Sequence, residues 1–162
     1  IERLWKLVAN EKGTGPKVEF VGKSAKYILH HIGIEVEDTK KLIIMEVANN
    51  HPFVQNEMLM PILPLVRCDN VDQAIEWAYK AEHGNRHSAM MHSTNIAKLS
   101  KMAKLMETTI FVKNGPSYAG LGIGGQGYPT FTIAGPTGEG LTSPKSFCRL
   151  RECVLKDMFN IR

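Results

Sequence analysis

The order of apolar and polar residues predicts short helices and strands along the first part of the chain. Apolar residues recur at helical spacing over residues 1–10 and 24–32, with a short extended run at 18–21 between them. Apolar runs rich in β-branched residues follow at 41–47 and 62–66, and a proline inside the second run favours an edge strand or a bulge. We therefore expect two helices followed by two strands.

The middle of the chain adds a helix and then a strand-helix-strand pattern. A helix is expected over residues 71–82, after an Asp-Asn pair that would cap it, and a strand over 88–92. A second helix over 95–106 and a second strand over 108–113 complete the pattern. Because parallel strands need a crossover of about this length, we expect an α/β fold with a mostly parallel sheet and crossover helices.

The last part of the chain predicts strands around a turn. We expect a strand over residues 130–134, a glycine-rich turn over 135–140 and a further strand over 146–156. Both faces of the last strand mix apolar and polar side chains, which is typical of an edge strand. We therefore expect residues 145–162 to act as an oligomerisation strand that pairs with another subunit; pairing within its own subunit is the alternative.

Composition places the chain among ordinary globular proteins. Its 162 residues are 43% hydrophobic and 22% charged, which is enough for one packed domain. No apolar run approaches the roughly 20 residues that a membrane-spanning helix needs, so we expect no membrane partner. The net charge of +4 comes from 20 basic and 16 acidic residues mixed along the chain. Without a concentrated basic patch, we expect no nucleic-acid partner.

The cysteines and the first residues indicate the setting of the chain. Cys68, Cys148 and Cys153 are an odd number without C-x-x-C spacing or a signal peptide, as in a reduced cytoplasmic protein. The last two fall in the expected terminal strand, where we expect small buried hydrophobic side chains rather than nucleophiles. The chain opens at Ile1, inside a helical pattern and without an N-cap residue, so we expect it to begin within a longer protein.

A glycine-rich segment at residues 119–128 is the strongest functional signal. Five glycines within eight residues forgo side-chain burial, which is typical of backbone that needs positive φ angles or close approach by another group. Two overlapping G-x-G-x-x-G matches occur, but a β-run with a proline at its entrance follows, instead of the helix that a dinucleotide fingerprint requires. We expect a concave nest of amides for an anion or a flat ligand. A loop that crosses tightly under its neighbours is the alternative.

Other catalytic constellations do not emerge from the sequence. The six histidines lack metal-binding spacing with a cysteine or carboxylate, the serines form no G-x-S-x-G elbow, and the carboxylates are scattered. From its residues alone, the chain predicts no metal site and no catalytic residue.

Four longer motifs follow one another along the chain. They are E-M-L-M-P-I-L-P at residues 57–64, A-E-H-G-N-R-H-S-A at 81–89, T-T-I-F-V-K-N-G-P at 108–116 and T-I-A-G-P-T-G-E-G at 132–140. With these motifs the chain closely resembles the C-terminal part of the catalytic domain of CoA-acylating aldehyde dehydrogenases. The likeness extends over nearly the whole chain and is greatest to the acetaldehyde and propionaldehyde enzymes of bacterial ethanolamine and propanediol utilisation.

This resemblance implies an aldehyde-dehydrogenase-like catalytic domain fragment. In the family, a short-chain aldehyde is oxidised to an acyl-CoA through a cysteine thioester, with NAD as cofactor and CoA as co-substrate. The cysteine and the dinucleotide-binding domain lie upstream of the matched region, so we expect the piece to be inactive alone and none of its cysteines to be the nucleophile. The resemblance also implies a homo-oligomeric full-length protein in the cytoplasm, or within a bacterial microcompartment.

The resemblance also implies individual residues that bind the cofactor or face the substrate. Glu57 falls where the wider superfamily has the glutamate of its E-x-F-G-P motif, which binds the nicotinamide ribose hydroxyls, and Pro61 agrees with that motif. Leu59 stands where the superfamily has phenylalanine, so the resemblance does not extend to the aromatic contact with the nicotinamide. The later glycine segment resembles the border of the active-site channel. The residues expected to face substrate or CoA are Asn114, Gly120, Gly122, Gly124 and Gly125.

Two functions of different classes are compatible with the sequence. We favour a fragment of the enzyme's catalytic domain; the alternative is a non-catalytic binding or assembly module that kept the fold and pairs through its terminal strand. In the open reading frame, an upstream cysteine and a nucleotide-binding domain would support the first. An initiator Met directly before Ile1 would support the second.

Overall fold

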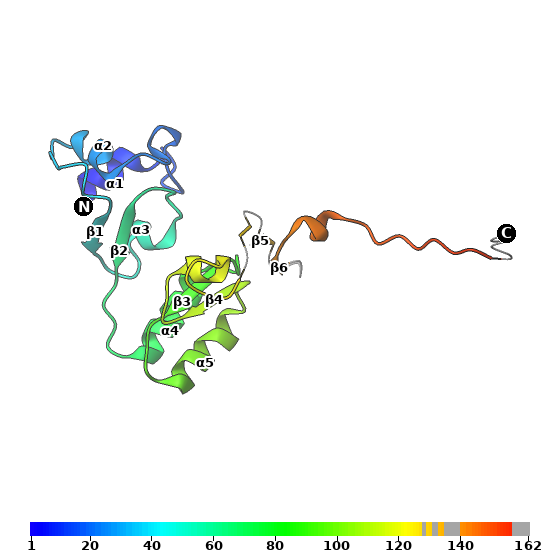
Figure 1. Ribbon diagram of the computed structural model, residues 1–162. Coiled ribbons are helices and arrows are strands. Elements are labelled where there is room, and N and C mark those ends of the chain that lie inside the picture. The colour runs from blue at the N-terminus through cyan, green and yellow to red at the C-terminus, as the bar shows by residue number, and fades with distance from the viewer. Residues whose placement is uncertain (128, 131–132, 135–139, 157–162) are drawn as a thin grey trace. The chain divides into compact units, whose positions relative to one another are not determined.

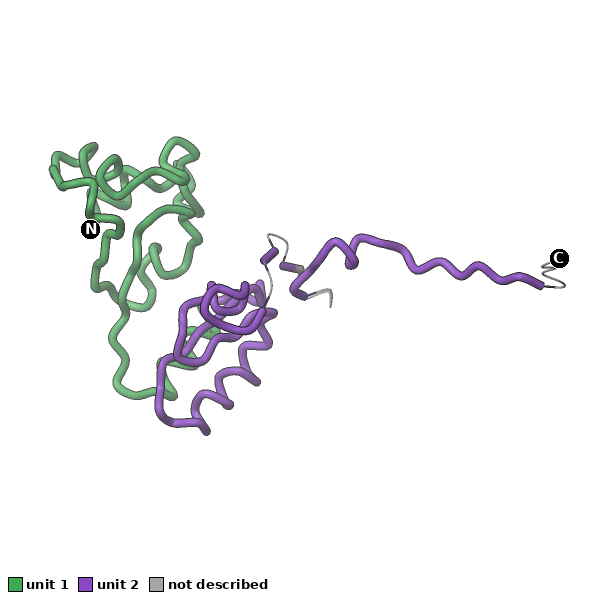
Figure 2. Tube along the Cα trace, in the orientation of Figure 1, with its two compact units in different colours: residues 1–81 green, residues 82–162 purple. Residues whose placement is uncertain are grey.

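Two compact units make up the computed structural model, one spanning residues 1–81 and the other residues 82–162 (Figures 1 and 2). Each unit contains a pair of parallel strands whose connection includes a helix. No helix in the described part of the chain has the length and apolar character that crossing a bilayer demands. The residues that the structure describes are 1–127, 129–130, 133–134 and 140–156.

The first unit combines short helices with a two-stranded parallel sheet. Its elements in chain order are α1 (Glu2–Val8), the 3-10 helix η1 (Val18–Phe20), α2 (Ala25–His30), β1 (Ile43–Glu46), α3 (Pro52–Gln55), β2 (Ile62–Leu65) and α4 (Val71–Ala81). Strands β1 and β2 pair in a register that places Ile43 beside Ile62 and Glu46 beside Leu65. The two expected helices and two expected strands are confirmed, with ends shifted by at most two residues.

Alternation along β1 decides which face of this sheet is buried. Met45 is 9% exposed and packs in the core, whereas Ile44, the preceding residue, is 58% exposed. Leu63 on β2, which pairs with Ile44, is also exposed. The sheet therefore has one covered face and one bare apolar face. The buried residues of the core are Leu4, Val8, Phe20, Ile28, Met45, Phe53 and Met58.

Local hydrogen bonds overturn one expectation for this unit. Residues 18–20 form η1 instead of an extended run, because Phe20 N–H donates to the Lys17 carbonyl at 3.1 Å and Val21 N–H donates to the Val18 carbonyl at 3.2 Å. Phe20 is 3% exposed, so burial of one ring and locally closed backbone bonds shape the segment. Periodicity does not predict α3, because four residues are too few to show it.

The second unit confirms the expected strand-helix-strand pattern. Its elements are β3 (Ser88–Met91), α5 (Ile96–Met106), β4 (Ile110–Lys113), the 3-10 helix η2 (Ser117–Leu121), β5 (Ile133–Ala134), β6 (Gly140–Leu141) and the 3-10 helix η3 (Pro144–Phe147). Strands β3 and β4 are parallel, and η2 packs against β4. Helix α5 begins after Asn95, whose side-chain oxygen accepts the Lys98 N–H at 3.1 Å. Its buried residues, Leu99, Met102 and Met106, recur at helical spacing.

The terminal segment differs from the expected strand. Its first residues belong to η3, and residues 148–156 have neither helix nor strand structure. Cys148 and Cys153 are exposed, so the expectation that they are buried is wrong, because no neighbouring strand within the described residues covers them. Pairing of residues 148–156 within their own subunit is likewise not seen in the described chain, and pairing with another subunit stays a prediction.

Three parts of the expected C-terminal elements lie outside the described residues. They are 131–132 of the strand, 135–139 of the turn and 157–162 of the oligomerisation strand.

The two faces of β1 predict opposite sensitivities to mutation. Met45→Ala should lower the free energy of unfolding by about 2–5 kcal/mol, because it leaves a cavity in the core. Ile44→Ala should change it by less than about 0.5 kcal/mol, because that side chain is 58% exposed. Denaturant unfolding of the chain measures both values, and equal losses would contradict the assignment of faces.

Candidate functional site

The residues expected at the site fall into two groups in different units. Glu57, Leu59 and Pro61 lie between α3 and β2 in the first unit. Asn114 and the glycines lie after β4 in the second unit.

The backbone around Glu57 is held from both sides. On the upstream side, α3 ends where the backbone and side-chain N–H groups of Asn56 both donate to the Pro52 carbonyl, each at 3.0 Å. On the downstream side, Met58 is 6% exposed in the core and the Leu59 carbonyl accepts the Gly22 N–H at 3.0 Å. The backbone of Glu57 is therefore fixed on both sides, from Asn56 to Leu59.

The Glu57 side chain itself is exposed. Within the described residues, its carboxylate makes no hydrogen bond and no ion pair. A carboxylate can accept hydrogen bonds through both oxygens and binds hydroxyl groups more strongly than a neutral acceptor does. A free carboxylate on a fixed backbone is suited to bind a pair of adjacent hydroxyls.

Leu59 and Pro61 shape the same segment in different ways. Leu59 has a φ of 53°, in the left-handed region that a side chain of this size rarely adopts, and it is exposed. The Pro61 carbonyl accepts the Ile43 N–H at 2.9 Å and so begins the pairing of β1 with β2. The observed contact of Pro61 is thus with the sheet.

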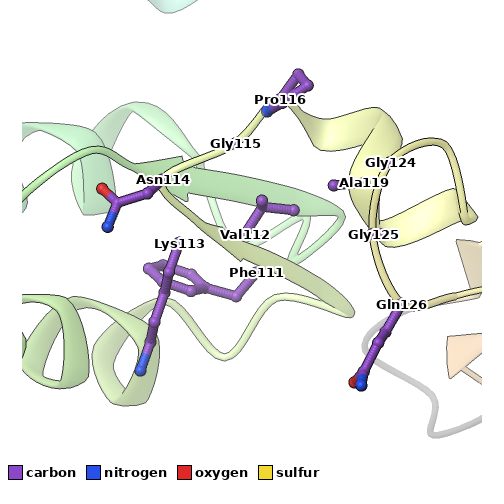
Figure 3. Close-up of a pocket in the computed structure, with 11 residues that line it drawn as sticks. Phe111, Val112, Lys113, Asn114, Gly115, Pro116, Ala119, Gly124, Gly125 and Gln126 are labelled. Carbon is purple, nitrogen blue, oxygen red and sulfur yellow. The ribbon is translucent and has the colours of Figure 1, made fainter.

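A cavity of about 550 Å³ lies beside the glycine segment (Figure 3). Four of the five residues expected to face a channel line this cavity. They are Asn114 directly after β4, Gly120 in η2, and Gly124 and Gly125 in the glycine turn, residues 122–127, that follows η2. Gly122 is not among the lining residues; it ends η2 with a φ of 89°. Phe111, Lys113 and Gln126 are also among the lining residues.

Close packing explains two of these glycines. A Cβ at Gly120 would overlap the Ile110 side chain, and a Cβ at Gly125 would lie 2.8 Å from the Ala119 carbonyl oxygen. The turn thus crosses tightly over η2 and β4, as in the alternative that the sequence leaves open. Tight crossing and a cavity are both present, because the same lack of side chains that lets the backbone pack also leaves the space beside it empty.

Asn114 is held by the neighbouring strand end. Its side-chain oxygen accepts the Ser93 N–H at 2.7 Å, and its side-chain N–H donates to the Ser93 carbonyl at 3.0 Å. Its backbone has a φ of 57° and its N–H donates to the Met91 carbonyl at 2.9 Å. The carboxamide points away from the glycine turn in Figure 3, so Asn114 lines the cavity while its amide joins the ends of β3 and β4. Sequence reasoning missed this role, since nothing in the pattern links Asn114 to Ser93.

The electrostatics of the described residues do not point to either group. Hydrogen bonds from Lys41, Arg67 and Lys80 lower the pKa values of the surface carboxylates Asp38, Glu46 and Glu76, respectively. In the described part of the chain, His, Cys, Asp and Glu side chains do not gather in threes as a metal site would need. The first group is therefore distinguished by the free carboxylate of Glu57, and the second group by the cavity beside the glycine segment.

Comparison with known proteins connects this geometry to a family. The aldehyde dehydrogenase family profile matches residues 2–128 of the chain. The acetaldehyde dehydrogenase (acetylating) EutE of Salmonella typhimurium is 50% identical over 153 residues, which are 94% of this chain and 33% of that protein.

Two solved structures agree with that match. The propionaldehyde dehydrogenase of Rhodopseudomonas palustris, with bound CoA and an acylated cysteine, is 64% identical with a TM-score of 0.89, and the match covers 95% of this chain and 35% of that one. An engineered glycolyl-CoA reductase with bound NADP+ is 63% identical with a TM-score of 0.89, over 95% of this chain and 35% of that one.

The chain thus spans about a third of the length of the relatives that it matches. The expected aldehyde-dehydrogenase-like α/β fold and the resemblance to the CoA-acylating branch are confirmed. On this evidence, the chain belongs to the aldehyde dehydrogenase family.

Proposed function

We propose that this chain is part of the catalytic domain of an enzyme that oxidises a short-chain aldehyde, with NAD and CoA, to an acyl-CoA. The similarity to an acetylating acetaldehyde dehydrogenase and to a CoA-bound propionaldehyde dehydrogenase supports this reaction. The NADP+ bound to a similar reductase supports a nicotinamide dinucleotide as cofactor. The full-length protein would work in the cytoplasm or within a bacterial microcompartment.

The reaction divides between a part outside this chain and the residues described here. A cysteine thiolate adds to the aldehyde carbon, the adduct loses a hydride to become a thioester, and the CoA thiol then displaces the cysteine and gives up its proton. When bound, NAD supplies the hydride acceptor. Overall, aldehyde, NAD+ and CoA yield acyl-CoA, NADH and one proton.

Glu57 carries the proposal for this chain, because its free carboxylate fits the group that it would hold. The two oxygens would accept hydrogen bonds from the two ribose hydroxyls beside the nicotinamide and fix the sugar. Because the backbone is held on both sides of Glu57, binding would cost little conformational entropy in this segment. Leu59, next to it and exposed, would offer an aliphatic surface in place of the superfamily's aromatic ring.

The cavity beside the glycine turn is the proposed place for the acyl group or part of CoA. Backbone amides of the glycine segment that borders it could donate hydrogen bonds to carbonyl or phosphate oxygens. Asn114 would keep the cavity wall in place by joining the ends of β3 and β4, while its amide stays on Ser93.

The cysteines of this chain do not suit the role of nucleophile. The thiols of Cys68 and Cys148 donate to the carbonyls of Val66 and Pro144, and Cys153 lies exposed on a segment without helix or strand structure. A reactive cysteine needs a neighbouring group that stabilises its thiolate, and a carbonyl oxygen is not such a group. This supports a nucleophile elsewhere in the full-length protein.

The terminal residues 145–162 are the proposed contact with another subunit. Leu150 is 94% exposed and Val154 is 73% exposed, in a segment that has backbone groups available for strand pairing. A second chain could cover both the side chains and the backbone.

The 162-residue chain should form no acyl-CoA from acetaldehyde or propionaldehyde with NAD and CoA. The full-length protein should do so, because it supplies the thiolate that this chain lacks. Following NADH absorbance and acyl-CoA by mass spectrometry tests both proteins under the same conditions. Turnover by the chain alone would show that the nucleophile lies within it.

Glu57→Gln in the full-length enzyme should raise the KM for NAD about tenfold to a hundredfold. The loss of charge-assisted hydrogen bonds, about 1.5–3 kcal/mol, accounts for that range. Glu19→Gln, at another exposed glutamate, is the matched control and should leave the KM unchanged. Similar KM values for both variants would remove Glu57 from the dinucleotide site.

Gly120→Ala in the full-length enzyme should lower kcat/KM for CoA by about tenfold to a hundredfold, because the new Cβ overlaps Ile110 and displaces the cavity wall. Gly124→Ala is the control in the same turn. Its Cβ meets no atom within 4 Å, which leaves the cost of a φ of 71°, about 1–2 kcal/mol. Steady-state kinetics with CoA as the varied substrate compare the two, and a larger loss for Gly124→Ala would argue against this wall.

A further inference from the structure

We propose that His51 is a positioning residue for Glu57, and that protonation of its imidazole releases the turn on which Glu57 is held. His51 precedes α3, the four-residue helix that leads through Asn56 directly to Glu57. The consequence for dinucleotide binding rests on the function proposed above for Glu57; the behaviour of the turn does not.

The imidazole of His51 caps α3. Its Nδ1 accepts the backbone N–H of Phe53 at 3.2 Å, which is the role that Ser, Thr, Asp or Asn usually plays at this position. A ring nitrogen can accept a hydrogen bond only when it carries no proton, so the neutral ring must hold its proton on Nε2. Gain of a second proton at Nδ1 converts this acceptor into a donor that faces another N–H group.

Aromatic packing fixes the ring in the capping position. The side chain of His51 is 15% exposed, and its ring stacks on Phe53 with centroids 5.4 Å apart and planes at 16°. The edge of Trp5 approaches from α1, with centroids 6.5 Å apart at 79°. Phe53 itself is buried in the core, with 4% of its surface exposed. Movement of the Phe53 side chain would therefore cost packing energy, whereas the hydrogen bond of the cap can break without moving that side chain.

Few charges face this imidazole in the described part of the chain. On α1, the Glu2 carboxylate lies 3.8 Å from Nε2, and it is 77% exposed. From α3, the ring of Phe53 faces the imidazole. The pair with the exposed Glu2 carboxylate is a weak interaction. A proton on Nδ1 removes the acceptor that caps α3, so the cap depends on the protonation state of the ring.

The cap is connected to Glu57 through a short series of hydrogen bonds. Gln55 donates to the Asn49 carbonyl at 2.7 Å, which ties the end of α3 to the segment before His51. Asn56 donates twice to the Pro52 carbonyl, one residue after the cap. Loss of the cap frays the first turn of a helix that has little more than one turn, so Asn56 and then Glu57 lose their fixed backbone.

Amide hydrogen exchange of the 162-residue chain tests the cap directly. The protection factor of the Phe53 amide, corrected for intrinsic exchange, should fall about fivefold between about pH 8 and pH 5, the factor that corresponds to about 1 kcal/mol. In His51→Asn, the amide oxygen accepts the same N–H and does not titrate, so protection should stay high at both pH values. His51→Ala should have low protection at both.

A second histidine variant separates this behaviour from general acid sensitivity. His30→Asn removes an exposed imidazole at the end of α2 that pairs with Glu35. The protection of the Phe53 amide should still depend on pH in this variant. Protection that is flat with pH in the unmodified chain, or a pH dependence that persists in His51→Asn, would overturn the proposal. If His51→Ala does not fold, the comparison with His51→Asn still decides.

The full-length enzyme tests the link to Glu57. On acidification, the KM for NAD should rise about fivefold more in the unmodified enzyme than in His51→Asn, with kcat unchanged between the two. Equal pH profiles of KM in an active enzyme would overturn the positioning role and leave the proposed function standing. Absence of acyl-CoA formation by the full-length protein would instead overturn the proposed function. The hydrogen-exchange experiment would still test whether protonation of His51 breaks the cap of α3.

Discussion

Parallel pairing of very short strands is the constraint on which both units depend. β1 with β2, and β3 with β4, align four residues each, and parallel strands cannot be joined by a tight turn. The chain between them must cross over, and it carries α3 in the first unit and α5 in the second. The candidate site residues follow from this connectivity, because Glu57 lies on one crossover and Asn114 at the end of a strand.

Burial of one face gives the first unit its order. Helices α1, α2 and α3 contribute apolar side chains to the core on the face that contains Met45. The other face, with Ile44, Leu63 and Leu65, is exposed, although parallel sheets are usually covered on both sides. The first unit thus holds Glu57 through its core, while the other face of the same sheet is not covered by described residues of this unit.

The two groups of site residues use opposite arrangements of backbone and side chain. At Glu57, hydrogen bonds and a buried Met58 hold the backbone, and the carboxylate is left free. At Asn114, the side chain makes two hydrogen bonds to the backbone of Ser93, and the cavity beside Asn114 is lined in part by glycines, which have no side chains. Under the function proposed above, the first arrangement would suit the hydroxyl groups of a sugar, and the second would suit an oxyanion.

Periodicity and turn residues determined the order of the main helices and strands, the parallel pairing and the family resemblance, because these depend on local patterns that a single chain displays. Tertiary structure decided what depends on distant neighbours. Val18–Phe20 forms a 3-10 helix because Phe20 is buried. The Asn114 side chain forms a hydrogen bond with Ser93, which lies 21 residues away in the sequence. Gly120 is small because Ile110 lies against it, and residues 148–156 form no strand because no partner strand is present in the described chain. Contacts between remote residues set these outcomes, and such contacts leave no periodic trace in the sequence.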